Sequence, residues 1–428
     1  MRNPAARYDL QPSGTTTVER ALDALNFFLA DVRDGLGPYL AIYLLTERKW
    51  DEAPIGSVMS IAAIAGILAQ TPAGALIDRS RAKRALMIAA AIAVTAACLL
   101  LPLLNRFELV AATQALAAAS GSVFAPAIAA VTLGIVGPKA FAARTGRNEA
   151  FNHAGNAVAA AIAGGTAYWF GPVVVFWLLA AMALASIAAT LSIPPTAIDH
   201  QVARGLDDME EHGASQDRPS GFRVLLTCRP LLIFAVSTVT FHFANAAMLP
   251  LVGQKLALVN RNLGTSLMSV CIIAAQMVMV PVAMLVGRKA DVWGRKPIFA
   301  TALAVLAIRG ALYPLSDNPY WLVSVQLLDG IGAGIFGALF PLVVADLTHG
   351  TGHFNISQGA IATATGLGGA LSTAVAGFII VHAGYSAAFL FLAAVACAGL
   401  IGYCALMPET LRAATTTSRT TALASLNE

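Results

Sequence analysis

The chain has 428 residues, of which 57% are apolar and only 12% are charged, and its net charge is +4. Soluble domains carry about 25% charged residues, and a single soluble core stops growing near roughly 250–300 residues. This chain therefore has more apolar surface than one soluble core can bury, and lipid can cover the excess. Its basic residues form short clusters without interleaved aromatic residues, which argues against nucleic acid as a partner.

In chain order, apolar runs predict twelve transmembrane helices. Each run is close to the ~20 helical residues that cross a bilayer core of about 30 Å. The run lengths and the lack of alternation exclude membrane strands. The predicted spans are 21–45, 54–77, 85–105, 107–137, 143–170, 173–194, 230–252, 264–287, 297–315, 320–347, 357–382 and 386–406.

The distribution of basic residues predicts the orientation. Twenty of the 27 Lys and Arg residues fall in the two terminal arms and in the loops on the same side, and five fall in the opposite loops. The positive-inside rule then places both termini in the cytoplasm of a multi-pass cell membrane protein, in the inner membrane if the cell is Gram-negative.

One long polar interruption divides the spans six and six, and we interpret it as a solvated cytoplasmic linker. The predicted organisation is an N-terminal six-helix bundle at 1–195, the linker at 196–229, a C-terminal six-helix bundle at 230–412 and a disordered tail at 413–428.

The two halves also repeat in sequence at an offset of 213 residues. The matched pairs include Gly74 with Gly287, Asp78 with Asp291, Phe141 with Phe354, Gly146 with Gly359, and Gly155 with Gly368. Two six-helix bundles related in this way enclose one site at their interface, near the bilayer midplane. The predicted fold class is an all-α membrane protein with twelve transmembrane helices in two pseudo-symmetric six-helix bundles.

The loops after the second and eighth spans resemble the signature loop of the major facilitator superfamily. The resembling residues are Gly74, Asp78, Arg79 and Lys83 in the first copy and Gly287, Asp291, Gly294, Arg295 and Lys296 in the second. The resemblance implies a monomeric secondary transporter in which this gating loop latches the outward-facing state. The aspartate is expected to meet the N-terminal dipole of a helix in the other half.

Two glutamines depart from a second family pattern. Gln114 and Gln326 align where the fourth-span motif of the family has an arginine. In the drug antiporters that arginine is tied to proton coupling, so the resemblance does not carry that mechanism over to this chain. We assign both glutamines to the substrate cavity.

The first span carries three carboxylates and one arginine. Because Asp23, Asn26, Phe27, Ala30, Asp31, Asp34 and Pro38 fall at three- and four-residue steps, they share a helix face that we expect to line the central cavity. A charge within the bilayer needs a partner or a water-filled cavity. We assign Asp31 and Asp34 to proton coupling and Asn26 to the cavity. Arg33 points away from this face toward another helix and is also assigned to the cavity. A structural ion-pair network is the alternative.

Further polar residues inside the spans complete the predicted site. His242 is a candidate proton carrier because its pKa is ordinarily close to neutral pH, and a core histidine is the alternative. Arg309 and Asp329, in the ninth and tenth spans, are expected to form an ion pair. The remaining predicted cavity residues are Asn148, Glu149 and Asn152 of the fifth span and Asn245 of the seventh.

These patterns favour a secondary transporter for a small organic solute, driven by protons and acting in efflux. The alternative is an uptake symporter for a metabolite or for a metal or metalloid species, which a group of Met, Cys and His residues in the seventh and eighth spans keeps open. No catalytic, nucleotide-binding or metal motif is found, so neither an enzyme nor a cofactor is predicted. The predicted partners are the solute, protons and the lipid bilayer.

Overall fold

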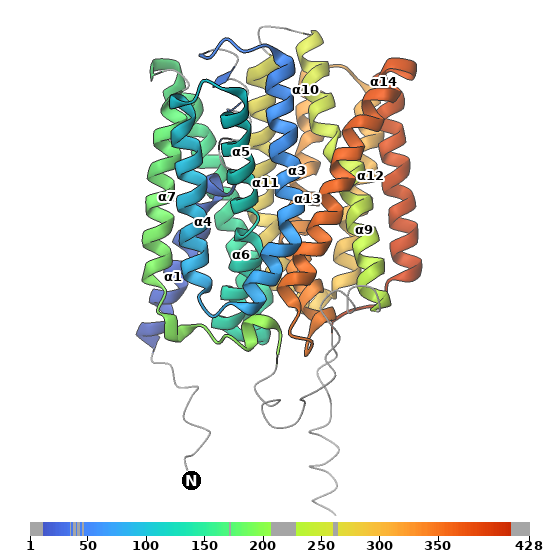
Figure 1. Cartoon of the computed structure of the whole chain (residues 1–428). Helices are drawn as coiled ribbons and strands as arrows, with labels where there is room; N and C mark the ends of the chain where they lie inside the picture. Colours follow the sequence, from blue (N-terminus) through green and yellow to red (C-terminus); the bar gives the residue numbers. More distant parts are fainter. Residues whose placement is uncertain are drawn as a thin grey trace, which may run out of the picture.

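The computed structural model describes residues 12–34, 36, 40, 43–44, 47–170, 173–206, 228–259 and 264–411. The described residues are almost entirely helical and contain no strand (Figure 1). Nine of their helical segments are long and apolar enough to cross a membrane, and two of these, with 57 and 53 residues, are long enough to cross twice. Residues 207–227 of the predicted linker lie outside the described residues, and so do residues 412–428, which include the whole predicted tail.

The helices run side by side along one direction (Figure 1). Those of the first half are α1 (Pro12–Asp34), α3 (Glu52–Arg79), α4 (Lys83–Leu100), α5 (Phe107–Gly121), α6 (Phe124–Phe170) and α7 (Val174–Ser192). Those of the second half are α9 (Arg229–Ala246), α10 (Met248–Val259), α11 (Gly264–Trp293), α12 (Arg295–Leu312), α13 (Pro319–Thr348) and α14 (Phe354–Leu406).

Glycine turns connect consecutive spans inside the two longest helices. Gly137 has φ 70° in α6, and Gly384 has φ 83° in α14. This region of φ is open to glycine but strained for other residues, so each glycine lets the chain reverse without a loop. The turns fall at the predicted boundaries between the fourth and fifth spans and between the eleventh and twelfth. The architecture is thus consistent with twelve spans.

Buried apolar side chains form two separate cores. One contains residues between Ala21 and Ala203, and the other contains residues between Leu231 and Met407 together with four side chains of α6. Large apolar side chains also lie exposed on the outside, such as Leu184 at 70% and Val381 at 81%. In water such a surface would be costly, whereas in a bilayer lipid chains cover it.

The halves meet along two seams that are related by the sequence repeat. One seam joins α3 to α14, and the other joins α11 to α6. A Cβ atom on Gly359 would lie 2.2 Å from the carbonyl oxygen of Gln70, and a Cβ atom on Gly146 would lie 2.5 Å from that of Ala283. Both pairs follow the offset of 213 residues, so the repeat in sequence is also a repeat of close backbone contacts between the halves.

Candidate functional site

A cavity of about 380 Å³ lies between the two halves, at the level where both seams are tight. Its N-terminal wall comes from α1, α3 and α6, and its C-terminal wall comes from α9, α13 and α14. The polar lining residues are Arg33, Gln70, Thr132, Thr145, Asn148, Glu149, His242, Gln358 and Thr365. The apolar lining includes Phe336, Phe340 and Pro341.

Asn148 is held in this wall by a network that also fixes α1 against α6. Its Nδ2 donates to Thr132 Oγ1 at 2.8 Å, and its Oδ1 accepts from Arg144 Nε at 2.8 Å. Arg144 and Arg147 both donate to the carboxylate of Asp23, with closest N–O distances of 2.6 Å. Two guanidinium groups thus compensate the burial of one carboxylate. This pairing was not predicted from the sequence.

Glu149 lies where the cavity meets the seam between α6 and α11. Its carboxylate accepts from Asn152 Nδ2 at 3.3 Å and lies 4.0 Å from His153 Nε2. The other ring nitrogen of His153 lies 2.8 Å from Gln276 Oε1, which belongs to the opposite half. Asn152 is not one of the lining residues of the cavity, so its described contact is with Glu149 and not with the cavity space.

The first span does not present its acidic face to the cavity as expected. Arg33 lines the cavity, whereas Asp31 does not. Side chains two positions apart on a helix point roughly 200° apart, so Arg33 and Asp31 cannot both face the same space. Asn26 is buried and donates to the carbonyl of Leu22 at 2.8 Å. The side chain of Asp34 lies outside the described residues.

His242 and Asn245, which the sequence places one turn apart on a cavity face, separate in the structure. His242 lines the cavity, with its ring edge against Phe336 at a centroid distance of 4.6 Å. Its Nδ1 lies 3.1 Å from the carbonyl oxygen of Thr238. Since a carbonyl only accepts, Nδ1 carries the proton and Nε2 is the acceptor in the neutral ring. Asn245 instead accepts from Arg309 Nη2 at 2.8 Å.

Arg309 belongs to a buried polar cluster inside the C-terminal half. It forms an ion pair with Asp329, as expected from the sequence. Gln326 Nε2 donates to Asp329 Oδ2 at 2.9 Å, and Gln326 Oε1 accepts from Tyr313 at 2.5 Å. Gln326 is therefore part of this cluster and does not line the cavity. Gln114 is also buried away from the cavity, and its Nε2 has no partner in the described part of the chain.

The first signature loop joins the two halves at the face of the bundle where α1 begins and α14 ends. The carboxylate of Asp78, near the end of α3, accepts from Asn355 Nδ2 at 2.8 Å and from the backbone N–H groups of Asn355 and Ile356 at 3.3 and 2.8 Å. These residues form the first turn of α14, where unpaired N–H groups and the helix dipole favour an anion. A Cβ atom on Gly74 would lie 2.2 Å from the carbonyl oxygen of Asn355, so glycine permits this approach. We call Asp78, Asn355 and Ile356 the latch. The two basic residues of this loop lie beside it, with Arg79 exposed and Lys83 Nζ donating to the carbonyl of Ser80 at 2.7 Å.

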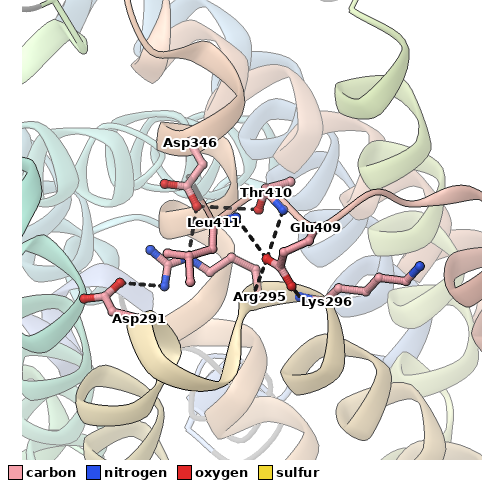
Figure 2. A network of polar contacts seen from close by, with 7 residues as sticks. All are labelled: Asp291, Arg295, Lys296, Asp346, Glu409, Thr410 and Leu411. Carbon is pink, nitrogen blue, oxygen red and sulfur yellow. Dashed lines mark hydrogen bonds and ion pairs between the residues drawn. The ribbon is translucent and has the colours of Figure 1, made fainter. Parts of the chain in front are cut away.

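The second signature loop makes its hydrogen bonds and ion pairs inside its own half (Figure 2). Arg295 donates to Asp291 at 2.7 Å and to Asp346 of α13 at 2.9 Å. Glu409 accepts from the backbone N–H groups of Arg295 and Lys296 at 2.8 and 3.1 Å. Burial acts to raise the pKa of Glu409, but four backbone N–H donors outweigh it and hold this pKa below its ordinary value. Gly287 of this loop lies in the seam, where a Cβ atom would meet Gly146. Gly294, with φ 86°, begins α12 beside Glu409.

Known proteins resemble this chain over nearly its whole length. The family model described as Major Facilitator Superfamily matches residues 22–308 and 262–426. Relatives from two strains of Mycobacterium tuberculosis, named uncharacterized MFS-type transporters, are 64% identical over 394 residues, which are 92% of this chain and 94% of theirs. The chain belongs to the Major Facilitator Superfamily.

Solved structures of MFS transporters share the fold. The human organic anion transporter MFSD10 is 14% identical with a TM-score of 0.67 and covers 92% of this chain and 100% of its own. The Escherichia coli fucose:proton symporter FucP is 15% identical with a TM-score of 0.66 and covers 91% and 98%. This MFS protein is therefore a multi-pass membrane protein and a secondary transporter that works by alternating access, in a family whose members are generally not enzymes.

The start of the linker in this MFS transporter is more than a solvated connection. The backbone N–H of Asp199 donates to the carbonyl of Gly134 at 2.9 Å, on the N-terminal side. The carbonyl of Ala203 accepts from Asn355 Nδ2 at 3.1 Å, on the C-terminal side. Ala203 is fully buried. Residues 195–206 thus contact both halves beside the latch, which a polar composition did not reveal.

The Met, Cys and His residues that kept a metal substrate open do not converge. Met248 is buried and its sulfur accepts from Arg309 Nε at 3.3 Å, whereas Met277 is 62% exposed on α11. His242 faces the cavity, and Cys271 is buried in the C-terminal core. Within the described residues, no group of three or more His, Cys, Asp and Glu side chains could hold a metal ion.

Proposed function

We propose that this MFS transporter is a monomer that couples proton movement to the efflux of a small organic compound, with both termini in the cytoplasm. The observation that supports it most is the composition of the central cavity. It holds a guanidinium, a carboxylate and an imidazole, from Arg33, Glu149 and His242, on walls that belong to different halves. Alternating access exposes such groups to each side in turn, which is what a proton carrier requires.

The proton carriers in this proposal are of two kinds. Glu149 and His242 lie at the cavity itself, where the solute and the proton can influence each other directly. Asp31 and Asp34 remain candidates in the first span, although Asp31 does not line the cavity. We give Glu149 the leading role because His153 links its surroundings to the opposite half across the seam.

The latch is proposed to hold the outward-facing state. Asp78 accepts three hydrogen bonds at the start of α14, and hydrogen bonds to a charged group contribute about 1.5–3 kcal/mol each. The second loop, with Asp291 bonded inside its own half, is proposed to shape the C-terminal bundle and not to latch the halves.

Uptake by proton symport is a second candidate. Gln114 and Gln326 occupy the positions where the drug antiporters have an arginine, and Gln326 is tied into the Arg309 cluster and away from the cavity. This removes one argument for antiport while leaving the cavity groups available for either direction.

Transport assays separate these candidates. A deletion strain and an overexpressing strain are screened for growth against antibiotics, metals and metabolites, and each hit is then followed in everted and right-side-out vesicles. Efflux predicts accumulation in everted vesicles that a protonophore abolishes, and uptake predicts the same in right-side-out vesicles. Transport that does not depend on the pH gradient in either kind of vesicle would reject proton coupling. Unchanged transport in the Glu149→Gln, Asp31→Asn and Asp34→Asn variants would reject the proposed carriers.

A further inference from the structure

Arg33, which is half-buried, differs from the other arginines inside the described spans of this transporter. Arg144 and Arg147 share the carboxylate of Asp23, and Arg309 has Asp329 and Asn245. Arg33 lines the central cavity, and no described residue forms a hydrogen bond or an ion pair with it. The protein thus compensates the buried guanidinium groups of Arg144 and Arg309 and leaves the half-buried one of Arg33 facing a space.

An uncompensated guanidinium inside a membrane protein is costly, so it marks a functional group whose partner comes from elsewhere. Arg33 lies about twelve residues after the predicted start of the first span, which is roughly 18 Å along the helix and close to the middle of the bilayer. Water in the cavity can solvate the group between transport events. A planar guanidinium is suited to binding a carboxylate or a similar oxyanion through two parallel hydrogen bonds.

The other polar groups of the cavity favour an anion over a cation. Glu149 already has Asn152 as a donor and His153 nearby, so its carboxylate has protein partners. By contrast, Thr145 Oγ1 lines the cavity, is buried and has no partner in the described part of the chain. The cavity side chains that lack a partner in the described part of the chain thus include a guanidinium and a hydroxyl, both of which can donate to an anion.

The part of the opposite wall that α13 contributes is apolar and aromatic. Phe336 and Phe340 of α13 stack on each other with ring centroids 5.4 Å apart, and Pro341 continues the same surface. A solute with its charge on Arg33 would therefore place an apolar body against the C-terminal half. Pockets of a few hundred Å³ that are largely apolar, with a few placed polar groups, suit small organic ligands.

We propose that the substrate is an amphiphilic organic anion, whose oxyanion binds Arg33 of the N-terminal half and whose apolar body packs on Phe336 and Phe340 of the C-terminal half. The solute then contacts both halves at the same time. This inference deepens the proposed function and rests on it for transport, although binding itself requires neither a proton gradient nor a direction.

The test uses the purified full chain and three probes that share a phenyl ring and a propyl chain: phenylpropionate, phenylpropanol and phenylpropylamine. Binding is measured as the concentration-dependent shift in thermal unfolding. We expect stabilisation by phenylpropionate above that by the alcohol or the amine. Arg33→Gln is expected to weaken this binding roughly tenfold or more, and Arg33→Lys less, because a charged hydrogen bond is lost in the first and retained in part in the second.

Arg106→Gln is the matched control, since it removes the same charge from an exposed loop. If Arg33→Gln does not fold, phenylglyoxal modification of Arg33 in the unaltered protein is read by mass spectrometry, and phenylpropionate should protect the residue. Equal stabilisation by the three probes, a preference for the amine, or no protection of Arg33 would overturn the proposal. Arg33-dependent binding without proton-driven flux would reject the proposed function and leave this inference standing.

Discussion

Asp78 and Asn355 belong to different halves of the chain, yet the carboxylate of Asp78 accepts hydrogen bonds from both the side chain and the backbone of Asn355. The repeat mate of Asp78 makes no equivalent contact, because Asp291 bonds to Arg295 four residues later. The two copies of one loop thus differ in what they join, and this asymmetry can be tested directly.

Replacing Asp78 by Asn should loosen the closed face of the bundle, because it removes the charge that accepts two backbone N–H groups at the start of α14. Loss of charged hydrogen bonds worth about 1.5–3 kcal/mol each should shift the conformational equilibrium at least tenfold. The measurement is the distance distribution between spin labels at the exposed positions 81 and 289 in a cysteine-free background. Asp291→Asn is the control and should leave the distribution unchanged; equal broadening in both variants would contradict the assigned latch.

Replacing Gly359 by Ala should separate α3 from α14. The new Cβ atom would lie 2.2 Å from the carbonyl oxygen of Gln70, which is backbone and cannot move aside cheaply. We expect a lower melting temperature and slower transport. Gly377→Ala lies in the same helix with nothing within 4 Å of its added Cβ, so it should be neutral or slightly stabilising through helix propensity. A destabilised Gly377→Ala variant would show that the seam is not the cause.

Replacing Asp329 by Ala should strongly destabilise the C-terminal half. It leaves the guanidinium of Arg309, which is 1% exposed, without its carboxylate, and removing one partner of a buried ion pair costs about 3–5 kcal/mol. Asp317→Ala is the comparison, because Asp317 pairs with Lys255, which is 9% exposed, while the Asp317 side chain is 74% exposed and its charge is therefore largely screened by water. Denaturant unfolding in detergent should rank the two variants in this order. Similar midpoints would mean that water reaches Arg309.

The contact between Glu409 and the start of α12 should be sensitive to acid. The pKa of Glu409 is held below its ordinary value, so its contribution is fully present above that value and is lost as the pH falls through the lowered pKa. We therefore expect the protection of the Arg295 and Lys296 amides against hydrogen exchange, taken relative to the intrinsic exchange rate at each pH, to fall only below about pH 4. In Glu409→Gln this protection should be low at all pH values, and a loss of protection near neutral pH in the unaltered protein would contradict the assignment.

The architecture could be predicted from the sequence because span length, charge asymmetry and the offset of 213 residues are each visible along the chain. The orientation of single side chains could not. The predicted polar face of the first span extends over a large part of the helix circumference. Which of its residues line the cavity depends on how the neighbouring helices pack against it, and in the structure Arg33 lines the cavity and Asp31 does not. The pairing of Asp23 with Arg144 links residues 121 positions apart and depends on how α1 packs on α6. Asn355 was missed because its role follows from where α14 begins.

The contact between Ala203 and Asn355 has a consequence for expressing the two halves as separate chains. Asn355 Nδ2 donates both to Asp78 and to the carbonyl of Ala203, so the peptide that connects the halves is a third component of the closed gate. Two separately expressed half-proteins, cut after residue 195, should reassemble with a gate that opens more readily than one cut within 207–227. The segment 195–206 would then stabilise the closed gate through its hydrogen bond with Asn355, in addition to connecting the two halves.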